Sequence, residues 1–171
     1  MKLRITALIV ALVTVFSVGA QNYGYNSTSS YFNSRFGFYI TYPGFMYPRG
    51  ESNNGDGCTF SSSDGRIIMT ASATFNVADW NTSSMLRDLK SWRIAEGSSI
   101  TYTFAKDGKV VLSGYTRSGR IYYEKHVLCK LYGPAYGGYV DVVATARVEY
   151  YPSDKSRGDK VVSYFSGFPY E

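Results

Sequence analysis

The sequence contains a single histidine, His126, and only two cysteines, Cys58 and Cys129, among 171 residues. One imidazole excludes metal sites built on a pair of histidines and any mechanism that needs two imidazoles. The cysteine count permits one disulfide between Cys58 and Cys129, and it equally permits two thiols packed as small apolar side chains. Both alternatives stay open.

Recognisable catalytic and nucleotide-binding motifs are missing. The chain has no G-x-S-x-G, H-E-x-x-H, P-loop or G-x-G-x-x-G pattern. His126 and Cys129 lie three residues apart in a predicted strand, so their side chains point to opposite faces and cannot act as a pair. We therefore expect no enzymatic activity, no metal and no cofactor.

Only one long apolar run occurs, and it lies at the start of the chain. Ile5–Phe16 follows the basic residues Lys2 and Arg4 and precedes the small residues Val18-Gly19-Ala20. The run is too short to cross a hydrocarbon core of about 30 Å comfortably. This pattern predicts a signal peptide over residues 1–20, cleaved after Ala20, and a periplasmic or secreted protein without a transmembrane segment in its mature form.

The charge is nearly balanced. Removing Lys2 and Arg4 leaves sixteen basic against thirteen acidic residues, a net charge of +3. The basic residues are scattered rather than clustered, so we expect no nucleic-acid partner.

Residue periodicity predicts one domain. Residues 21–34 are rich in Ser, Asn and Tyr and are expected to form a flexible polar arm, and residues 35–171 form the domain. Period-two alternation predicts several strands, for example over 36–42, 67–75, 121–131 and 138–150. Helical spacing appears near 83–96 and 155–167. Short turns between the strands require antiparallel pairing.

The predicted fold class is therefore α+β, with an antiparallel sheet of about six to eight strands packed against two or more helices. A cone-shaped fold of the cystatin or nuclear-transport-factor type is the runner-up. That fold usually places a long helix before the sheet, and no such helix is predicted here.

Alternation also sorts the side chains of the two longest strands. Val127, Val142 and their neighbours form an apolar face. The opposite face carries a mixture of aromatic, charged and hydrogen-bonding groups: Tyr122, Glu124, His126, Tyr139 and Arg147. Such a surface suits a glycan, a peptide or a partner protein, and a merely solvated face is the alternative.

Three segments resemble a known family. They are Tyr31–Pro43 (N-S-R-F-G-F-x-I-x-Y-P), Glu51–Phe60 (E-S-x-N-G-D-G) and Ser113–Lys125 (S-G … I-x-Y-x-K). Their order resembles small exported bacterial proteins of the PsbP-like family, from about Tyr31 to Phe168. The resemblance implies a PsbP-like α/β/α sandwich, a bacterial host and a non-catalytic binding or accessory role, and it carries over no catalytic residue.

The function expected from these observations is an exported, non-catalytic binding or accessory domain. Another envelope or secreted protein, or a glycan, is the expected partner. The alternatives are an envelope-associated structural protein without a specific ligand, and a hydrolase that uses a surface carboxylate such as Glu124 or Asp141 as a base.

Export is directly testable. Protein recovered from an exporting bacterial host should have the intact mass of residues 21–171, because signal peptidase is expected to cut after Ala20. A mature protein that retains Met1 would contradict the prediction.

Overall fold

The computed structural model describes residues 27–170. Its strands are β1 Thr28–Phe32, β2 Tyr39–Pro43, β3 Met46–Glu51, β4 Gly57–Ser62, β5 Ile67–Phe75, β6 Ser99–Lys106, β7 Lys109–Tyr115, β8 Ile121–Gly133 and β9 Gly138–Tyr150. The helices are α1 Thr82–Ala95 and α2 Lys155–Ser163, with short 3-10 turns at Pro134–Tyr136 and Pro152–Asp154. None of the helices within 27–170 has the length and apolar character that a bilayer crossing needs. The predicted signal peptide lies outside the described residues.

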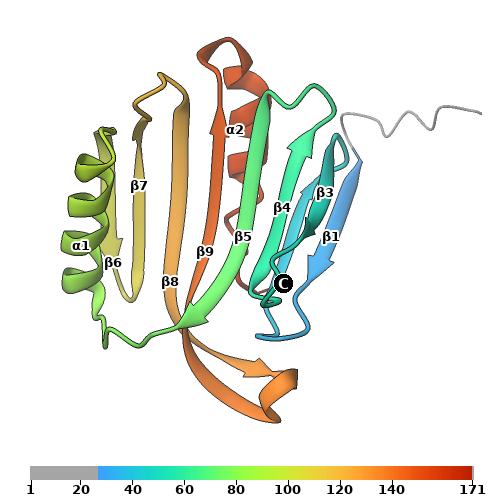
Figure 1. The fold of residues 1–171 in the computed structure, drawn as a ribbon, viewed down its shortest axis with the longest axis vertical. Coiled ribbons are helices and arrows are strands. Elements are labelled where there is room, and N and C mark those ends of the chain that lie inside the picture. The colour runs from blue at the N-terminus through green and yellow to red at the C-terminus, as the bar shows by residue number, and fades with distance from the viewer. Residues whose placement is uncertain (1–26, 171) are drawn as a thin grey trace, which may run out of the picture.

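Seven strands form one antiparallel sheet in the order β3-β4-β5-β9-β8-β7-β6, and β1 pairs with β2 in a separate hairpin (Figure 1). The prediction of an α+β fold with an antiparallel sheet and two helices is confirmed. Both expected helices are present, although α2 ends at Ser163, before the end predicted at residue 167.

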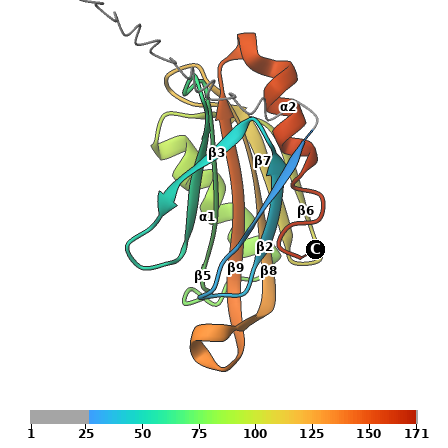
Figure 2. The same ribbon diagram turned by 90° about the vertical axis from the view of Figure 1, so that its right-hand side faces the viewer.

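The sheet has a core on each face. On one face the β1–β2 hairpin and α2 cover a cluster that includes Phe60, Met69 and Val142. On the other face α1 places Met85 and Leu89 against Val110, Leu112, Tyr122 and Val143. Adjacent residues Val142 and Val143 thus enter different cores, as alternation along a strand requires. Turned by 90°, the molecule shows α1 and α2 on opposite sides of the sheet (Figure 2).

The β1–β2 hairpin is bonded to the loop between β3 and β4 at the edge of the sheet. Arg35 pairs with Asp56 at 2.6 Å, and the side-chain amide of Asn33 donates to the Gly55 carbonyl at 2.8 Å. Asn33 also accepts from the backbone N–H of Phe36, which closes the turn of the hairpin. Two of the segments that carry the family resemblance are therefore in direct contact.

The C-terminal segment is held by a buried lysine. Lys125 of β8 is 8% exposed, and its ammonium donates to the carbonyls of Phe165, Ser166 and Phe168 at 2.7, 3.1 and 2.8 Å. Burial lowers the pKa of Lys125. The three carbonyls follow α2 and have no further helical turn to bond, so the lysine satisfies them inside the core.

One expectation differs from the structure, and the structure decides between the two alternatives left open for the cysteines. Thr28–Phe32, placed in the flexible arm over 21–34, forms β1 and pairs with Tyr39–Pro43. Cys58 and Cys129 are both free thiols. They lie on β4 and β8, which β5 and β9 separate. Three strand spacings amount to about 14 Å, twice the reach of a disulfide of about 7 Å between Cα atoms.

The role of Lys125 can be measured. Lys125→Met keeps much of the side-chain volume but leaves three buried carbonyls without their donor, so urea unfolding should show a loss of about 2–3 kcal/mol. Lys130→Met, on the same strand but with a side chain 71% exposed, should change stability by less than about 0.5 kcal/mol. Equal effects of the two substitutions would contradict this role.

Candidate ligand-binding site

The five residues expected on one open surface separate into two groups. Tyr122, Glu124 and His126 are buried, and the side chain of Arg147 is 17% exposed. Tyr139 is 75% exposed and lies near the tip of the β8–β9 hairpin, where its ring packs against Tyr132. The structure thus brings four of the five together and leaves Tyr139 apart.

The expectation of an open surface is wrong because α1 covers this face. Met85 and Leu89 need an apolar partner, and Val110, Leu112 and Val143 of the sheet provide it. Tyr122 is enclosed beneath the helix, with its hydroxyl donating to the Ser99 carbonyl at 3.3 Å. The predicted face is a second core with a polar centre.

Glu124 is that polar centre. Its carboxylate is fully buried and accepts from Arg93 Nε of α1 at 2.9 Å and from Arg147 Nη1 of β9 at 2.7 Å. Burial alone would raise the pKa of Glu124, but the adjacent His126 and Arg93 outweigh it and lower the pKa from 4.5 to about 2. The carboxylate is therefore ionised at neutral pH, and its pairing joins α1 to the sheet.

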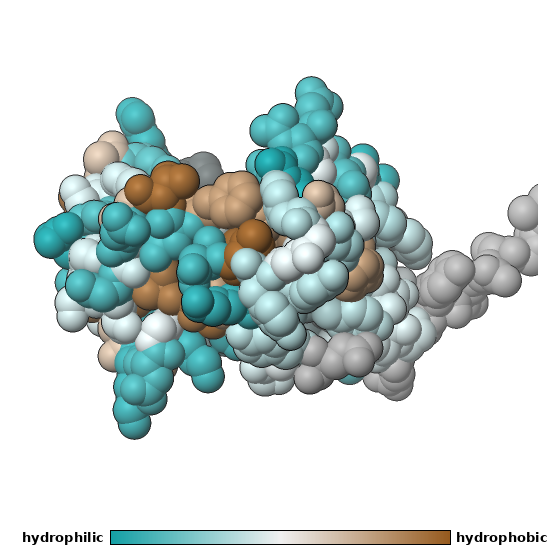
Figure 3. All heavy atoms as spheres, turned by 90° about the horizontal axis from the view of Figure 1, so that it is seen from below, coloured by the Kyte–Doolittle hydropathy of each residue, from teal (hydrophilic) through white to brown (hydrophobic). Residues whose placement is uncertain are grey.

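A cavity of about 390 Å³ lies beside this centre, between α1, the loop 76–80 and the sheet. We call it the α1 cleft. Its lining is mostly apolar and aromatic, with a few polar groups: Thr74, Phe75, Asn76, Val77, Ala78, Trp80, Asp88, Leu89, Trp92, His126, Val143 and Thr145. Viewed from the end of the sheet where β5 leads into α1, apolar residues are exposed between polar margins (Figure 3).

Local hydrogen bonds fix the positions of the aromatic side chains that line the α1 cleft. The Asn76 side chain accepts from the Trp80 N–H at 2.9 Å and donates to the Trp80 carbonyl at 3.1 Å. The Trp80 indole N–H donates to Asp88 at 2.9 Å, and its ring centre lies 5.4 Å from that of Trp92. Asn81 then caps α1 through the backbone N–H groups of Ser83 and Ser84. These hydrogen bonds to Asn76 and Asp88 fix the position of Trp80.

His126 supplies a polar group on the inner wall of the cleft. The residue is 5% exposed, and its Nδ1 lies 3.0 Å from the Thr145 hydroxyl. Its Nε2 is buried and has no hydrogen-bond partner, and the nearest carboxylate oxygen, Glu124 Oε1, is 3.6 Å away. A buried polar atom without a hydrogen-bond partner costs free energy.

The positions of Glu124 and Asp141, the two carboxylates considered as catalytic bases, limit the chemistry that they could perform together. Glu124 is paired with two arginines, whereas Asp141 is exposed and lies 3.7 Å from Lys130. Their positions in the β8–β9 register are six residues apart, or about 20 Å along the strands, so the two carboxylates do not share a site. Among residues 27–170 no cluster of three or more His, Cys, Asp or Glu side chains could hold a metal ion.

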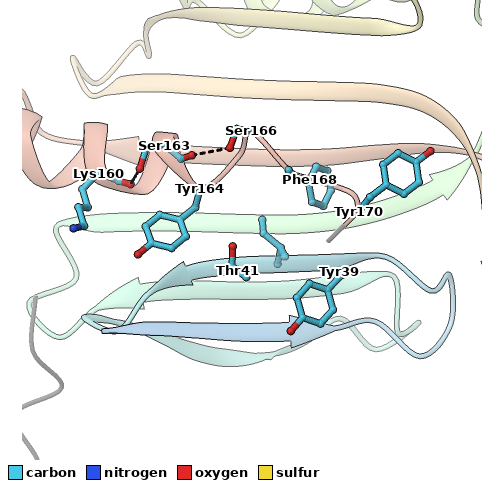
Figure 4. Close-up of a pocket in the computed structure, with 10 residues that line it drawn as sticks. Tyr39, Thr41, Lys160, Ser163, Tyr164, Ser166, Phe168 and Tyr170 are labelled. Atoms are coloured by element: carbon cyan, nitrogen blue, oxygen red, sulfur yellow. Dashed lines mark hydrogen bonds between the residues drawn. The ribbon is translucent and has the colours of Figure 1, made fainter. Parts of the chain in front are cut away.

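A second and larger cavity, of about 570 Å³, lies between β2 and α2. Residues of β2 such as Tyr39 and Thr41 lie on one side, and residues of α2 and the following segment such as Ser163, Tyr164 and Tyr170 lie on the other (Figure 4). Its polar lining consists mainly of hydroxyl groups. The α1 cleft has the more apolar lining of the two cavities and contains both tryptophans, so it is the stronger candidate for an apolar ligand.

Sequence reasoning missed Trp80, Trp92 and Thr145 as site residues. Trp92 is 51% exposed at the cleft although it shares the helical spacing of α1. A signal was present, because tryptophan is enriched at interfaces and both tryptophans of the sequence lie in or just before the helix predicted near 83–96.

Comparisons with models of known protein families and with curated proteins find no match for this chain.

The Glu124 network makes a prediction about acid stability. In the unfolded chain Glu124 is protonated near its ordinary pKa, whereas in the folded protein it stays ionised down to about pH 2. Its contribution is therefore complete above about pH 5 and is lost as the pH falls toward 2. Wild-type protein should lose this part of its unfolding free energy in urea titrations across that window.

Glu124→Gln should remove that pH dependence and cost about 3 kcal/mol at pH 7, because two largely buried guanidinium groups lose the carboxylate that they share. Glu96→Gln removes the other, 56% exposed partner of Arg93 and should cost less than about 1 kcal/mol. A Glu124→Gln variant with wild-type acid sensitivity would contradict the assignment.

Proposed function

We propose that this chain is an exported, non-catalytic binding domain that takes up a small, largely apolar ligand in the α1 cleft. One observation carries the proposal, namely that the α1 cleft is a concave cavity whose lining is mainly apolar and aromatic and includes polar side chains such as Asn76, His126 and Thr145. Sites for small molecules typically combine an apolar, concave lining with a few polar groups of this kind.

Export and a PsbP-like sandwich form part of the same proposal. The signal-peptide pattern over residues 1–20 supports export. The resembling segments supply Asn33, Arg35, Asp56 and Lys125, which hold the hairpin and the C-terminal segment on the sheet. The resemblance therefore concerns residues that maintain the layers, and it supports a shared fold more directly than a shared ligand.

A hydrolytic role is the competing proposal. Thr145 Oγ1 lies 3.0 Å from His126 Nδ1, and Glu124 stands behind the imidazole, as in a nucleophile, base and carboxylate arrangement. However, both oxygens of Glu124 are bonded to arginines, and the nearer oxygen lies 3.6 Å from Nε2, beyond hydrogen-bond distance. This favours binding over turnover.

The binding role can be tested with N-phenyl-1-naphthylamine, an uncharged aromatic probe that fluoresces in apolar sites. The mature chain should bind one equivalent. Thr74→Trp places a large ring at the cleft and should weaken binding at least tenfold. Ile68→Trp adds the same ring on the same strand and face, outside the cleft lining, and should leave binding unchanged.

Three results would overturn the proposal. Absence of probe binding by the wild type would favour a purely structural envelope protein. Binding that Thr74→Trp does not weaken would place the probe elsewhere. Turnover of ester or amide substrates that disappears in Thr145→Val would favour the hydrolase instead.

A further inference from the structure

Strand β2 pairs with β1 along only one of its two edges. At the ends of this pairing the Asn33 N–H donates to the Phe38 carbonyl at 2.9 Å, and the Gly44 N–H donates to the Ser27 carbonyl at 2.8 Å. In an antiparallel pair, residues that bond to the partner strand alternate with residues whose backbone groups point away from it. The even-numbered residues of β2 are therefore directed at β1, and the odd-numbered residues are directed at the opposite edge, which we call the free edge of β2.

Two odd-numbered residues of β2 agree with this assignment. The Tyr39 N–H donates away from β1, to the Pro169 carbonyl at 3.0 Å. Pro43, which has no N–H, occupies a position where pairing with β1 needs no donor. Thr41 lies between these two residues, so its N–H and its carbonyl both point to the free edge. Within residues 27–170 no backbone hydrogen bond reaches Thr41 from that side.

The free edge of β2 borders the cavity of about 570 Å³ between β2 and α2 (Figure 4). Tyr39 and Thr41 line the cavity on the side of β2, and the segment that follows α2 lines the other side. That segment bonds to the edge at Tyr39 and then turns, with the Tyr170 N–H donating to the Gly167 carbonyl at 2.9 Å. The backbone groups of Thr41 therefore face a cavity rather than a neighbouring strand.

The unpaired backbone groups and the lining indicate the chemistry of a ligand. A donor and an acceptor on the edge of a strand are complemented by the acceptor and the donor of another extended backbone. Two buried apolar side chains, Ile40 and Phe168, also line the cavity. Side chains alternate between the two faces of a strand, so every second side chain of an added strand would face these apolar groups. A peptide with alternating apolar residues fits both features.

We propose that the free edge of β2 binds an extended peptide segment as an added strand. The Thr41 N–H donates to a carbonyl of the peptide, and the Thr41 carbonyl accepts from one of its amide N–H groups. The site lies on the face of the sheet that α2 and the β1–β2 hairpin cover, whereas the α1 cleft lies on the other face. The proposal is therefore independent of the small-molecule function proposed for the α1 cleft.

The peptide acetyl-Thr-Val-Thr-Val-Thr-amide tests the proposal, because it is uncharged, favours an extended backbone and alternates apolar with polar side chains. In a titration of the mature chain labelled with nitrogen-15, the Thr41 amide proton should shift downfield and exchange more slowly with solvent. The same peptide with every backbone nitrogen methylated keeps its side chains and loses its N–H donors. It should bind at least tenfold more weakly.

Variants of Thr41 assign the binding to its backbone. Thr41→Pro removes the N–H at the free edge without removing a bond to β1, and it should weaken peptide binding at least fivefold. Thr41→Val keeps the N–H and loses only the side-chain hydroxyl, so its affinity should stay within twofold of the wild type. If Thr41→Pro does not fold, the methylated peptide and the shift of the Thr41 amide still decide the proposal.

Three outcomes would overturn the proposal. One is a saturating peptide that does not move the Thr41 amide signal. Another is equal affinity for the peptide and its methylated form, which would show that side chains alone are recognised. The third is binding of a neutral oligosaccharide, maltotriose, without binding of the peptide, which would assign the cavity to a glycan. None of these outcomes bears on the α1 cleft, which N-phenyl-1-naphthylamine tests separately.

Discussion

A single buried carboxylate organises one half of this molecule. Glu124 has no solvent exposure, and its two oxygens are held by Arg93 from the helix and by Arg147 from the neighbouring strand. Loss of one arginine would leave a buried carboxylate oxygen without its donor, and loss of both would leave an uncompensated charge in a low-dielectric interior, which is costly. The position of α1 on the sheet, the orientation of His126 and the back wall of the α1 cleft all depend on this pairing. The guanidinium of Arg147 also lies over the Tyr122 ring, at 5.0 Å from its centre, so the network continues into the apolar core.

A different set of contacts holds the layers on the opposite face of the sheet, which the β1–β2 hairpin and α2 cover. There the hairpin is joined to the β3–β4 loop by Asn33 and Arg35, and the segment after α2 is held by Lys125 through three carbonyls. Glycine adds to this arrangement, since a Cβ atom at Gly158 would lie 2.4 Å from the Tyr150 ring, so only glycine lets α2 approach β9 this closely. The two faces of the sheet are therefore held by separate networks, and substitutions on one face should be separable from those on the other.

Much of the fold could be predicted from alternation, but the site could not. Periodicity correctly places the alternate residues Phe36, Phe38, Ile40 and Tyr42 in the core, and it correctly sends His126 and Cys129 to opposite faces. Alternation identifies which residues share a face, and it contains no information about what covers that face. The apolar pair Met85 and Leu89 indicated that α1 needs a partner, but several sheet faces would have satisfied it. Thr28–Phe32 was missed for a related reason, because a polar edge strand has the composition of a loop and is defined by its pairing.

The central claim is that the α1 cleft binds a small, largely apolar molecule. Trp80 and Trp92 are the only tryptophans in the sequence and both line the cleft, so the two indole N–H signals of protein labelled with nitrogen-15 report on this site. The account predicts that both signals shift when N-phenyl-1-naphthylamine is added. Indole signals that saturating probe does not move would contradict it.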